Sequence, residues 1–403
     1  MNVNHLYQSV LAARQRLEPV LSRTKLIHSD FFSQESGHDV YIKPENLQKT
    51  GAFKLRGAYN KVAQLNETER KTGVIAASAG NHAQGVAYGA SLLGIEATIV
   101  MPSQTPLIKV NATRQYGANV VLHGDTYDDA WHHALELQKS GGQVMIHPFD
   151  DVQVMAGQGT IGLEILSELP DADVILVPVG GGGLISGIGA YVKTAAPKCR
   201  VIGVEPEGAL SMHTALREGR VVSLPAVHTV ADGVAVKRVG DQTFEFCRQV
   251  VDEIIPVSDY DIMDTFLMLL EKHKIVAENA GALGLAALKK IQGKNLKVVS
   301  VLSGGNIDVV TVSAMINKGL TRRGRIFCFS VDLPDTPGQL VNISSILARQ
   351  MANVIKLDHD QFMNFDRFSH VQLQVTVETN GHEHIRGIVQ DLNAAGYQIR
   401  QVY

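Results

Sequence analysis

The stretch from Val174 to Leu184 has the sequence VILVPVGGGGL. Its first half is a short apolar run rich in β-branched residues, which predicts a buried strand. Its second half is four consecutive glycines, whose backbone amides can converge on an anion at the positive end of a following helix. No Lys-Ser or Lys-Thr pair follows the glycines, so a nucleotide-binding P-loop does not fit. The segment therefore predicts a strand, an anion-binding turn and a helix; the alternative is a tight turn that binds nothing.

The same region is a candidate for crossing a membrane. Residues 174–192 carry no charge and are long enough to span a bilayer. Pro178 and six glycines would break such a helix in mid-span. We therefore expect no transmembrane segment here.

Similar short apolar runs recur from about residue 70, separated by segments of helix length. This alternation is typical of parallel strands covered by helices, so we expect an α/β fold with two open, twisted, mostly parallel sheets. Glycine-rich polar stretches follow three of the strands, at 78–82, 180–183 and 303–306. Because open sheets bind ligands beyond the carboxyl ends of their strands, we expect these stretches to share one cleft. Besides 174–179, the predicted strands are 74–78, 97–101, 119–122, 144–146, 201–204, 254–257 and 298–302.

The pattern changes after about residue 320, and residues 321–325 (TRRGR) resemble a linker. The following segments predict strand, helix, strand, strand, helix and strand, which is the order of a ferredoxin-like unit. We expect a separate domain at 326–403, following a first region at 1–320. The six predicted elements are 326–333, 339–350, 353–358, 369–378, 382–395 and 397–402.

Composition excludes several classes of protein. The 403 residues carry a formal net charge of −3, so we expect neither a nucleic-acid-binding nor a membrane-binding surface. Three widely spaced cysteines do not form a disulfide framework or a zinc site, and the N-terminus has no apolar signal segment. We therefore expect a cytoplasmic protein.

The stretch from Thr50 to Gly57, TGAFKLRG, places Lys54 after a small-residue turn and before a predicted helix. A lysine in such a setting can be desolvated, lose its proton and form a Schiff base with an aldehyde. The alternative is an ordinary solvated lysine.

Two other strand ends carry suitable polar groups. The stretch from Ser78 to His82 opens a predicted helix, whose free amides can hold a carboxylate, and Asn81 can bond a phenolic oxygen. His82 alternatively serves only as a polar residue in the first helical turn. Ser303 ends a buried strand, where its hydroxyl can donate to a ring nitrogen; the alternative is a helix N-cap for the segment after Asn306.

Pyridoxal phosphate requires a lysine that forms an imine, backbone amides that bind its phosphate, a partner for its ring nitrogen and a site for the substrate carboxylate. The segments described above offer a candidate for each of these four features. The motifs 50–57, 78–85, 180–184 and 303–306 resemble, in order and spacing, those of the tryptophan-synthase-β or fold-type II group. Within it, the chain is most similar to threonine dehydratases and serine racemases. The resemblance covers residues 1–320 and implies a small subdomain at about 50–150 inserted into a larger one.

The resemblance implies a role for each motif residue. Lys54 is the expected Schiff-base lysine and the base that removes the Cα proton. Ser78, Gly80, Asn81 and His82 are the expected carboxylate site. The implied cofactor contacts begin with Phe53 and Gly233, which would pack on the two faces of the ring. Asn81 would contact the ring oxygen, Ser303 the ring nitrogen, and Glu278 would lie near the ring. The implied phosphate contacts are Gly180, Gly181, Gly182, Gly183 and Leu184. A solvated helix residue is the alternative for Glu278.

The implied reaction converts L-threonine to 2-oxobutyrate and ammonia, and L-serine to pyruvate. Serine racemases have a serine where this chain has Ala79, and a methyl group cannot reprotonate the substrate, so we expect elimination with little racemisation. The alternatives are a serine racemase, a 3-hydroxyaspartate dehydratase or a β-replacement synthase, and, outside enzymes, an amino-acid sensor with a dead catalytic fold.

The family's divalent-cation site corresponds to Glu205, the Ala209 carbonyl and Ser211. The family has an acidic residue at the third position, so the neutral Ser211 makes a bound cation doubtful, and we expect no metal.

The last domain resembles an ACT domain through its element order and residues 332–340, DLPDTPGQL. The resemblance implies isoleucine or valine as an effector, bound near Pro337, Gly338, Gln339 and Leu340, and a homo-oligomer, either dimer or tetramer. A dimerisation module without a ligand is the alternative. The sequence leaves open whether the role is isoleucine biosynthesis or threonine catabolism.

Overall fold

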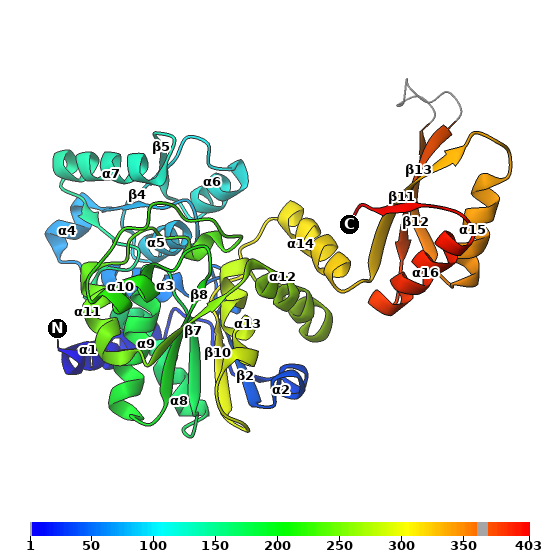
Figure 1. Cartoon of the computed structure of the whole chain (residues 1–403). Coiled ribbons are helices and arrows are strands. Elements are labelled where there is room, and N and C mark those ends of the chain that lie inside the picture. Colours follow the sequence, from blue (N-terminus) through cyan, green and yellow to red (C-terminus); the bar gives the residue numbers. More distant parts are fainter. Residues whose placement is uncertain (1, 361–369) are drawn as a thin grey trace. The chain divides into compact units, whose positions relative to one another are not determined.

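The computed structural model describes residues 2–360 and 370–403. The chain divides into two compact units, Met1–Ile307 and Asp308–Tyr403 (Figure 1). The division precedes helix α14 (Val309–Arg322), so the expected boundary at residue 320 lies inside a helix of the second unit.

The larger sheet of the first unit has the strand order β1-β2-β10-β7-β8-β9. All neighbours are parallel except β1 and β2. Four of these strands confirm predicted ones, but β1 and β2 precede the region in which strands were expected. The bounds are β1 Ile27–His28, β2 Asp39–Pro44, β7 Val174–Pro178, β8 Arg200–Pro206, β9 Glu253–Val257 and β10 Lys297–Leu302.

The smaller sheet has the order β5-β4-β3-β6, and all its neighbours are parallel. It confirms the four predicted strands between residues 74 and 146, with ends that agree within one residue. The bounds are β3 Val74–Ala77, β4 Ala97–Met101, β5 Asn119–Leu122 and β6 Val144–Met145.

Helices cover both sheets of the first unit. Short 3-10 or π turns are η1 Glu45–Leu47, η2 Asp232–Val234, η3 Leu269–His273, η4 Asn279–Ala282 and η5 Leu288–Lys290. The α-helices are α1 Val3–Leu17, α2 Asp30–Ser36, α3 Lys54–Val62, α4 Glu67–Thr72, α5 Asn81–Ser91, α6 Leu107–Arg114, α7 Tyr127–Gly141, α8 Val152–Glu168, α9 Gly183–Ala195, α10 Ser211–Glu218, α11 Asp241–Val250, α12 Asp259–Met268 and α13 Leu283–Ala286. Among the described residues, no helix has both the length and the apolar character needed to cross a bilayer.

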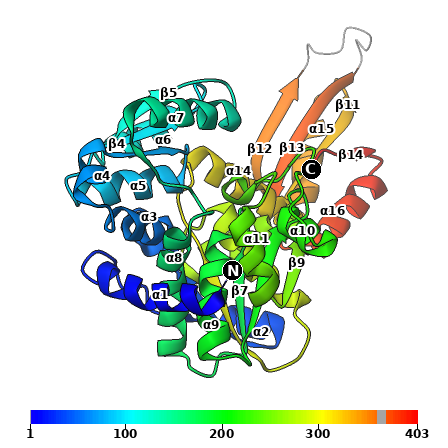
Figure 2. The same ribbon diagram turned by 90° about the vertical axis from the view of Figure 1, so that its left-hand side faces the viewer.

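Helices α3, α8 and α9 lie side by side with their backbones nearly touching (Figure 2). A Cβ on Gly157 of α8 would lie 2.4 Å from the Arg56 carbonyl oxygen of α3. A Cβ on Gly187 of α9 would lie 2.1 Å from the Met155 carbonyl oxygen of α8. Only glycine allows this approach, so α8 fixes the spacing between the helix that begins at Lys54 and the helix that follows the four glycines.

A buried cluster of ion pairs stabilises the position of α3. Arg56 is fully buried and donates two hydrogen bonds to Glu45, at 2.7 and 2.8 Å, and two to Glu164, at 2.6 and 2.8 Å. Burial alone would lower the pKa of Arg56, but the two carboxylates more than offset it and hold the pKa above its ordinary value. Lys43 of β2, also buried, donates to Glu164 at 2.6 Å. Strand β2 therefore tolerates a lysine inside the protein because that lysine has a partner.

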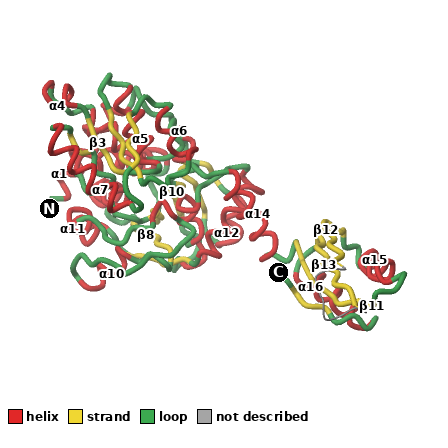
Figure 3. The backbone as a smooth tube through the Cα atoms, turned by 90° about the horizontal axis from the view of Figure 1, so that it is seen from above, coloured by secondary structure: helices red, strands yellow, loops and turns green. Residues whose placement is uncertain are grey.

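After α14, the second unit consists of an antiparallel sheet of order β12-β13-β11-β14 with two helices packed on it (Figure 3). Alternate residues of β11 and β13, such as Phe327, Phe329 and Val375, form a core with Ile343 and Ile388 of the helices. The predicted order of elements is confirmed, although the last strand is shorter than expected. Residue 369, where the third strand was expected to start, lies outside the described residues. The bounds are β11 Ile326–Pro334, α15 Gln339–Arg349, β12 Asn353–Asp360, β13 His370–Glu378, α16 His382–Ala394 and β14 Ile399–Gln401.

The Arg56 cluster gives a test of what holds α3. Arg56→Met should lower the free energy of unfolding of the first unit by about 3–5 kcal/mol, because Glu45 would remain buried without its partner. Urea denaturation followed by circular dichroism measures this. Arg238→Met removes an exposed pair with Asp241 and should cost less than about 1 kcal/mol. Equal losses in the two variants would contradict the assignment.

Candidate functional site

The end of β10 pairs with the turn that precedes α3. Ala52 and Gly304 form an antiparallel bridge, and the Phe53 amide donates to the Ser303 carbonyl at 3.0 Å. The Gly305 amide donates to the Gly51 carbonyl at 2.9 Å. This pairing places Ser303 beside Lys54, although the two are far apart in sequence. Helix α14 is capped by Asp308, so the alternative role of Ser303 as a helix cap is wrong.

Lys54 is the first residue of α3 and is partly buried. Its Nζ donates to the Pro148 carbonyl at 2.7 Å and lies 5.2 Å from the centre of the Phe53 ring. Burial lowers the pKa of Lys54 to about 8, although the Glu278 carboxylate acts in the opposite direction. A larger share of this amine is therefore neutral near physiological pH than for an ordinary lysine, and the neutral form is the one that attacks an aldehyde.

Four glycines line the turn between β7 and α9. A Cβ on Gly181 would lie 2.3 Å from the Phe149 ring, and a Cβ on Gly182 would lie 2.6 Å from the Met212 Cε. Gly182 also has a φ of +96°, which favours glycine. The turn thus offers backbone amides at the start of a helix with no side chain of its own in the way, a geometry suited to a phosphate.

The loop from His147 to Asp150 connects Lys54 with these glycines. Pro148 accepts from the lysine, and Phe149 packs on the glycine turn. The Asp150 carboxylate accepts from three amides in the first turn of α11, at 2.9 to 3.2 Å. From that turn, the Thr243 hydroxyl donates to the Gly181 carbonyl at 2.6 Å. Asp150 and Thr243 were not predicted from the sequence, because neither belongs to a recognisable motif. Only the folded structure brings them to the glycine turn.

Asn81 and Glu278 meet at the start of α5. The Asn81 amide donates to both oxygens of Glu278, at 2.8 and 2.9 Å, and its own oxygen accepts from Asn306 at 2.8 Å. Glu278 is buried, so its interpretation as a solvated helix residue is wrong. Burial raises the pKa of Glu278 to about 7. Gly233 lies against it, since a Cβ there would be 3.6 Å from the Glu278 Oε1.

The predicted carboxylate site lies at the first turn of α5. Its N-cap, Gly80, has no side chain to bond the first amides of the helix, which leaves them for a ligand. The His82 side chain is buried, and its Nε2 is 2.7 Å from the Ile146 carbonyl, which makes Nε2 the protonated nitrogen. Burial lowers the pKa of His82 to about 3, so the ring is neutral.

The predicted residues thus fall into two groups. Contacts connect Lys54, Phe53, Ser303, Asn81, Glu278 and Gly233, and the loop at 147–150 links this group to the glycine turn, which continues into the buried Leu184. Residues 337–340 belong to the other unit, where Leu340 is 42% exposed. One loop joins the Lys54 amine, whose pKa is lowered, to the anion-binding amides of the glycine turn. This arrangement fits a ligand that has both an aldehyde and a phosphate group.

Glu205, at a position that corresponds to the family's cation site, bonds other groups of the protein. Glu205 is buried, and its carboxylate accepts from the Met212 and His213 amides, both at 2.8 Å, and from Ser211 at 3.4 Å. Burial raises its pKa to about 7. Within the described part of the chain, no cluster of three metal-ligating side chains occurs. A hard cation prefers several charged oxygens, and this single carboxylate, already bonded by a helix start, does not fit one.

Residues 17–304 match the model of the pyridoxal-phosphate dependent enzyme family. The chain belongs to that family. Over 396 residues it is 47% identical to an L-threonine ammonia-lyase of Thermotoga maritima, covering 98% of this chain and 99% of the relative. The solved structure of processed threonine deaminase isoform 2 from Solanum lycopersicum has a TM-score of 0.76 and 40% identity, covering 79% of this chain and 89% of that one. Maize serine racemase has a TM-score of 0.74 and 35% identity, covering 79% and 98%.

This pyridoxal-phosphate-dependent enzyme should capture its cofactor with an unusual pH dependence. Because burial favours the neutral form of Lys54, imine formation by the apoenzyme should accelerate as pH rises and level off with a midpoint near 8. Stopped-flow absorbance after addition of pyridoxal phosphate measures the rate. A blocked lysine amide in the same buffers is the control and should titrate near 10.4. A protein midpoint near the control value would contradict the lowered pKa.

Asp150 should influence cofactor affinity through α11. Asp150→Ala frees the three amides of the first turn and loosens Thr243 against Gly181, so the dissociation constant of pyridoxal phosphate should rise roughly tenfold. Equilibrium dialysis measures it. Asp308→Ala removes a helix cap in the second unit and should leave the constant unchanged. An unaltered constant in Asp150→Ala would show that the α11 contact does not support the glycine turn.

Proposed function

We propose that the chain is an L-threonine ammonia-lyase, which converts L-threonine to 2-oxobutyrate and ammonia and also acts on L-serine to give pyruvate. The observation that carries the proposal is the 47% identity with an L-threonine ammonia-lyase over almost the whole of both chains. The site geometry supports it, because the residues that this chemistry requires lie within one connected group.

In this proposal each residue has a defined task. Pyridoxal phosphate, when bound, supplies an electron sink for the charge that develops at Cα. Ser78, Gly80, Asn81 and His82, at the start of α5, would hold the substrate carboxylate. The Lys54 amine accepts the Cα proton. The uncharged Ser303 hydroxyl would bond the ring nitrogen of the cofactor, and Asn81, which is held by Glu278 and Asn306, would bond its ring oxygen. The amides of Gly180–Leu184 hold the phosphate.

Racemisation of serine is the competing activity, since the chain also resembles a serine racemase structure. The presence of Ala79 disfavours racemisation. The residue lies within the loop between β3 and α5 and packs partly against the core of the smaller sheet, and its methyl group has no exchangeable proton to return to the substrate. Elimination is therefore the outcome that the site supports.

We also propose that the second unit is an ACT domain with a regulatory role in a cytoplasmic homo-oligomer. Its β-α-β-β-α-β order and the turn at Gly338, with a φ of +99°, support this assignment. Isoleucine or valine is the expected effector, with residues 337–340 as the site that the resemblance suggests.

The proposed activity is tested with the purified holoenzyme and L-threonine or L-serine. We expect 2-oxobutyrate and pyruvate, released with equal amounts of ammonia, and little D-serine by chiral chromatography. Lys54→Ala should lose both the absorbance of the lysine-bound cofactor and turnover, by at least about a thousandfold. Full activity in Lys54→Ala, or D-serine as the main product, would overturn the proposal.

A further inference from the structure

The side chain of Asn306 connects two segments of the site. Its Nδ2 donates to the Thr50 carbonyl and to the Asn81 Oδ1, both at 2.8 Å. Thr50 belongs to the stretch that leads to Lys54, and Asn81 is the first residue of α5. Asn306 has no assigned role, unlike Ser303 in the same motif, yet it joins the lysine segment to the residue that would bond the ring oxygen of the cofactor.

Packing against Gly51 also holds this side chain. A Cβ on Gly51 would lie 2.3 Å from the Asn306 Oδ1, and Gly51 has a φ of +73°, so the position favours glycine on both grounds. The Gly305 amide, next along the chain, donates to the Gly51 carbonyl at 2.9 Å. Although Asn306 is exposed, two hydrogen bonds and one close backbone contact therefore define where its amide lies.

A backbone carbonyl sets the direction of these hydrogen bonds. A carbonyl oxygen only accepts, so Asn306 must present its NH₂ group to Thr50. The second hydrogen of the same group then points to Asn81, which must present its oxygen in return. The orientation of the Asn81 amide is thus determined from Thr50 through Asn306, and this orientation places the Asn81 Nδ2 at Glu278.

Glu278 does not determine this orientation by itself. An ionised carboxylate only accepts, but a protonated carboxyl also donates and can face either end of an amide. Burial raises the pKa of Glu278 to about 7, so both forms are present near neutral pH. Asn306 does not titrate, and its NH₂ group selects the same orientation of Asn81 in both cases.

One N–H of Asn81 remains for a ligand. The two Glu278 oxygens lie 2.8 and 2.9 Å from the Asn81 Nδ2. Because they belong to one carboxylate, they lie close together and a single N–H meets both of them best. A hydrogen bond from the other N–H to the ring oxygen of the cofactor would favour the form in which that oxygen is charged. An amide turned by 180° would place its own oxygen there instead and repel the charge.

We propose that Asn306 is a positioning residue, which makes Asn81 present an N–H group and not its carbonyl oxygen to the ring oxygen of pyridoxal phosphate. Asn306 acts only through Asn81 and does not itself contact the cofactor. The inference rests on the place that the proposed function gives to Asn81.

Two measurements on Asn306→Ala, Asn81→Ala and the double variant test the proposal. The first is the absorption spectrum of the holoenzyme, since the lysine-bound cofactor absorbs in the visible when its ring oxygen is charged and in the near ultraviolet when that oxygen carries a proton. The second is the dissociation constant of pyridoxal phosphate. Asn306→Ala should shift absorbance toward the near ultraviolet and raise the dissociation constant about three- to tenfold, because part of one hydrogen bond is lost.

The double variant separates positioning from a general structural effect. Asn81→Ala should change both quantities at least as much as Asn306→Ala does. Adding Asn306→Ala to Asn81→Ala should change neither quantity further, because a residue that acts only through another has no effect once that other is gone.

Asn46→Ala is the matched control. Asn46 is also an asparagine beside the end of β10, where its side chain lies against Gly305 and donates to the Val276 carbonyl at 3.1 Å. It bonds neither Thr50 nor Asn81 among the described residues. Its removal should leave the spectrum and the dissociation constant as in the parent.

The outcomes distinguish the proposal from the assignment on which it rests. An unchanged spectrum in Asn306→Ala, with a shift in Asn81→Ala, overturns the role of Asn306 and leaves Asn81 at the ring oxygen. An unchanged spectrum in both variants overturns the role of Asn306 together with the place of Asn81. An equal effect of Asn306→Ala with and without Asn81, or the same effect in Asn46→Ala, indicates a loosened site and also overturns the proposal. Neither measurement uses turnover, so the result does not depend on whether the enzyme deaminates threonine.

Discussion

The position of Lys54 depends on the burial of Arg56, two residues further along the same helix. A guanidinium inside the protein is tolerable only when carboxylates occupy its donors, and Glu45 and Glu164 do so from two other elements. These bonds fix where α3 begins and which way its first turn faces. Among the described residues, the hydrogen bond of the lysine amine goes to a carbonyl and no carboxylate pairs with it directly, so the amine remains available for covalent chemistry while its helix is held rigidly.

The second constraint is the close approach of backbones. Glycines at the contacts between α3, α8 and α9 hold α3, which begins at Lys54, at a fixed separation from α9, which follows the glycine turn. The loop at 147–150 connects Lys54 with that turn. The polar groups at the start of α5 form a hydrogen-bonded chain from Asn306 through Asn81 to Glu278. Burial moves the pKa values of Lys54 and Glu278 toward neutrality from opposite sides, a pattern common at catalytic sites.

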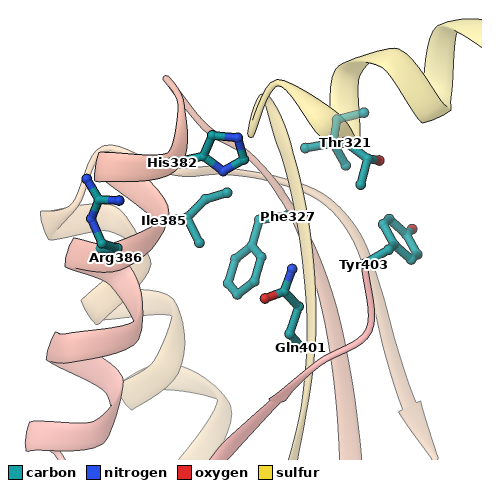
Figure 4. Close-up of a pocket in the computed structure, with 8 residues that line it drawn as sticks. Thr321, Phe327, His382, Ile385, Arg386, Gln401 and Tyr403 are labelled. Carbon is teal, nitrogen blue, oxygen red and sulfur yellow. The ribbon is translucent and has the colours of Figure 1, made fainter. Parts of the chain in front are cut away.

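Local sequence patterns predicted most of the strands, because a parallel strand buried on both faces is a continuous apolar run. Strand β2 was missed for a related reason: Asp39 and Lys43 interrupt its apolar character, and only the distant Glu164 makes Lys43 acceptable inside the protein. Asp150 and Thr243 were likewise absent from the expected site, because their importance comes from the amides and carbonyl that they bond. A pocket of about 280 Å³ in the second unit combines residues from α14, β11, α16 and β14 (Figure 4), and no single segment indicates it.

The sequence by itself determined the α/β class, the strands of the first unit from residue 74 onward, the order of elements from β11 to β14 in the second unit and the motifs that suit pyridoxal phosphate. Each of these depends on neighbouring residues or on the backbone freedom of glycine. The tertiary structure decided which charges are buried and what each contacts: the partners of Arg56, the bonds of Glu205 and the neutral state of His82. The reason is that the free energy of a buried charge depends on groups from distant parts of the chain, and these come together only in the folded protein.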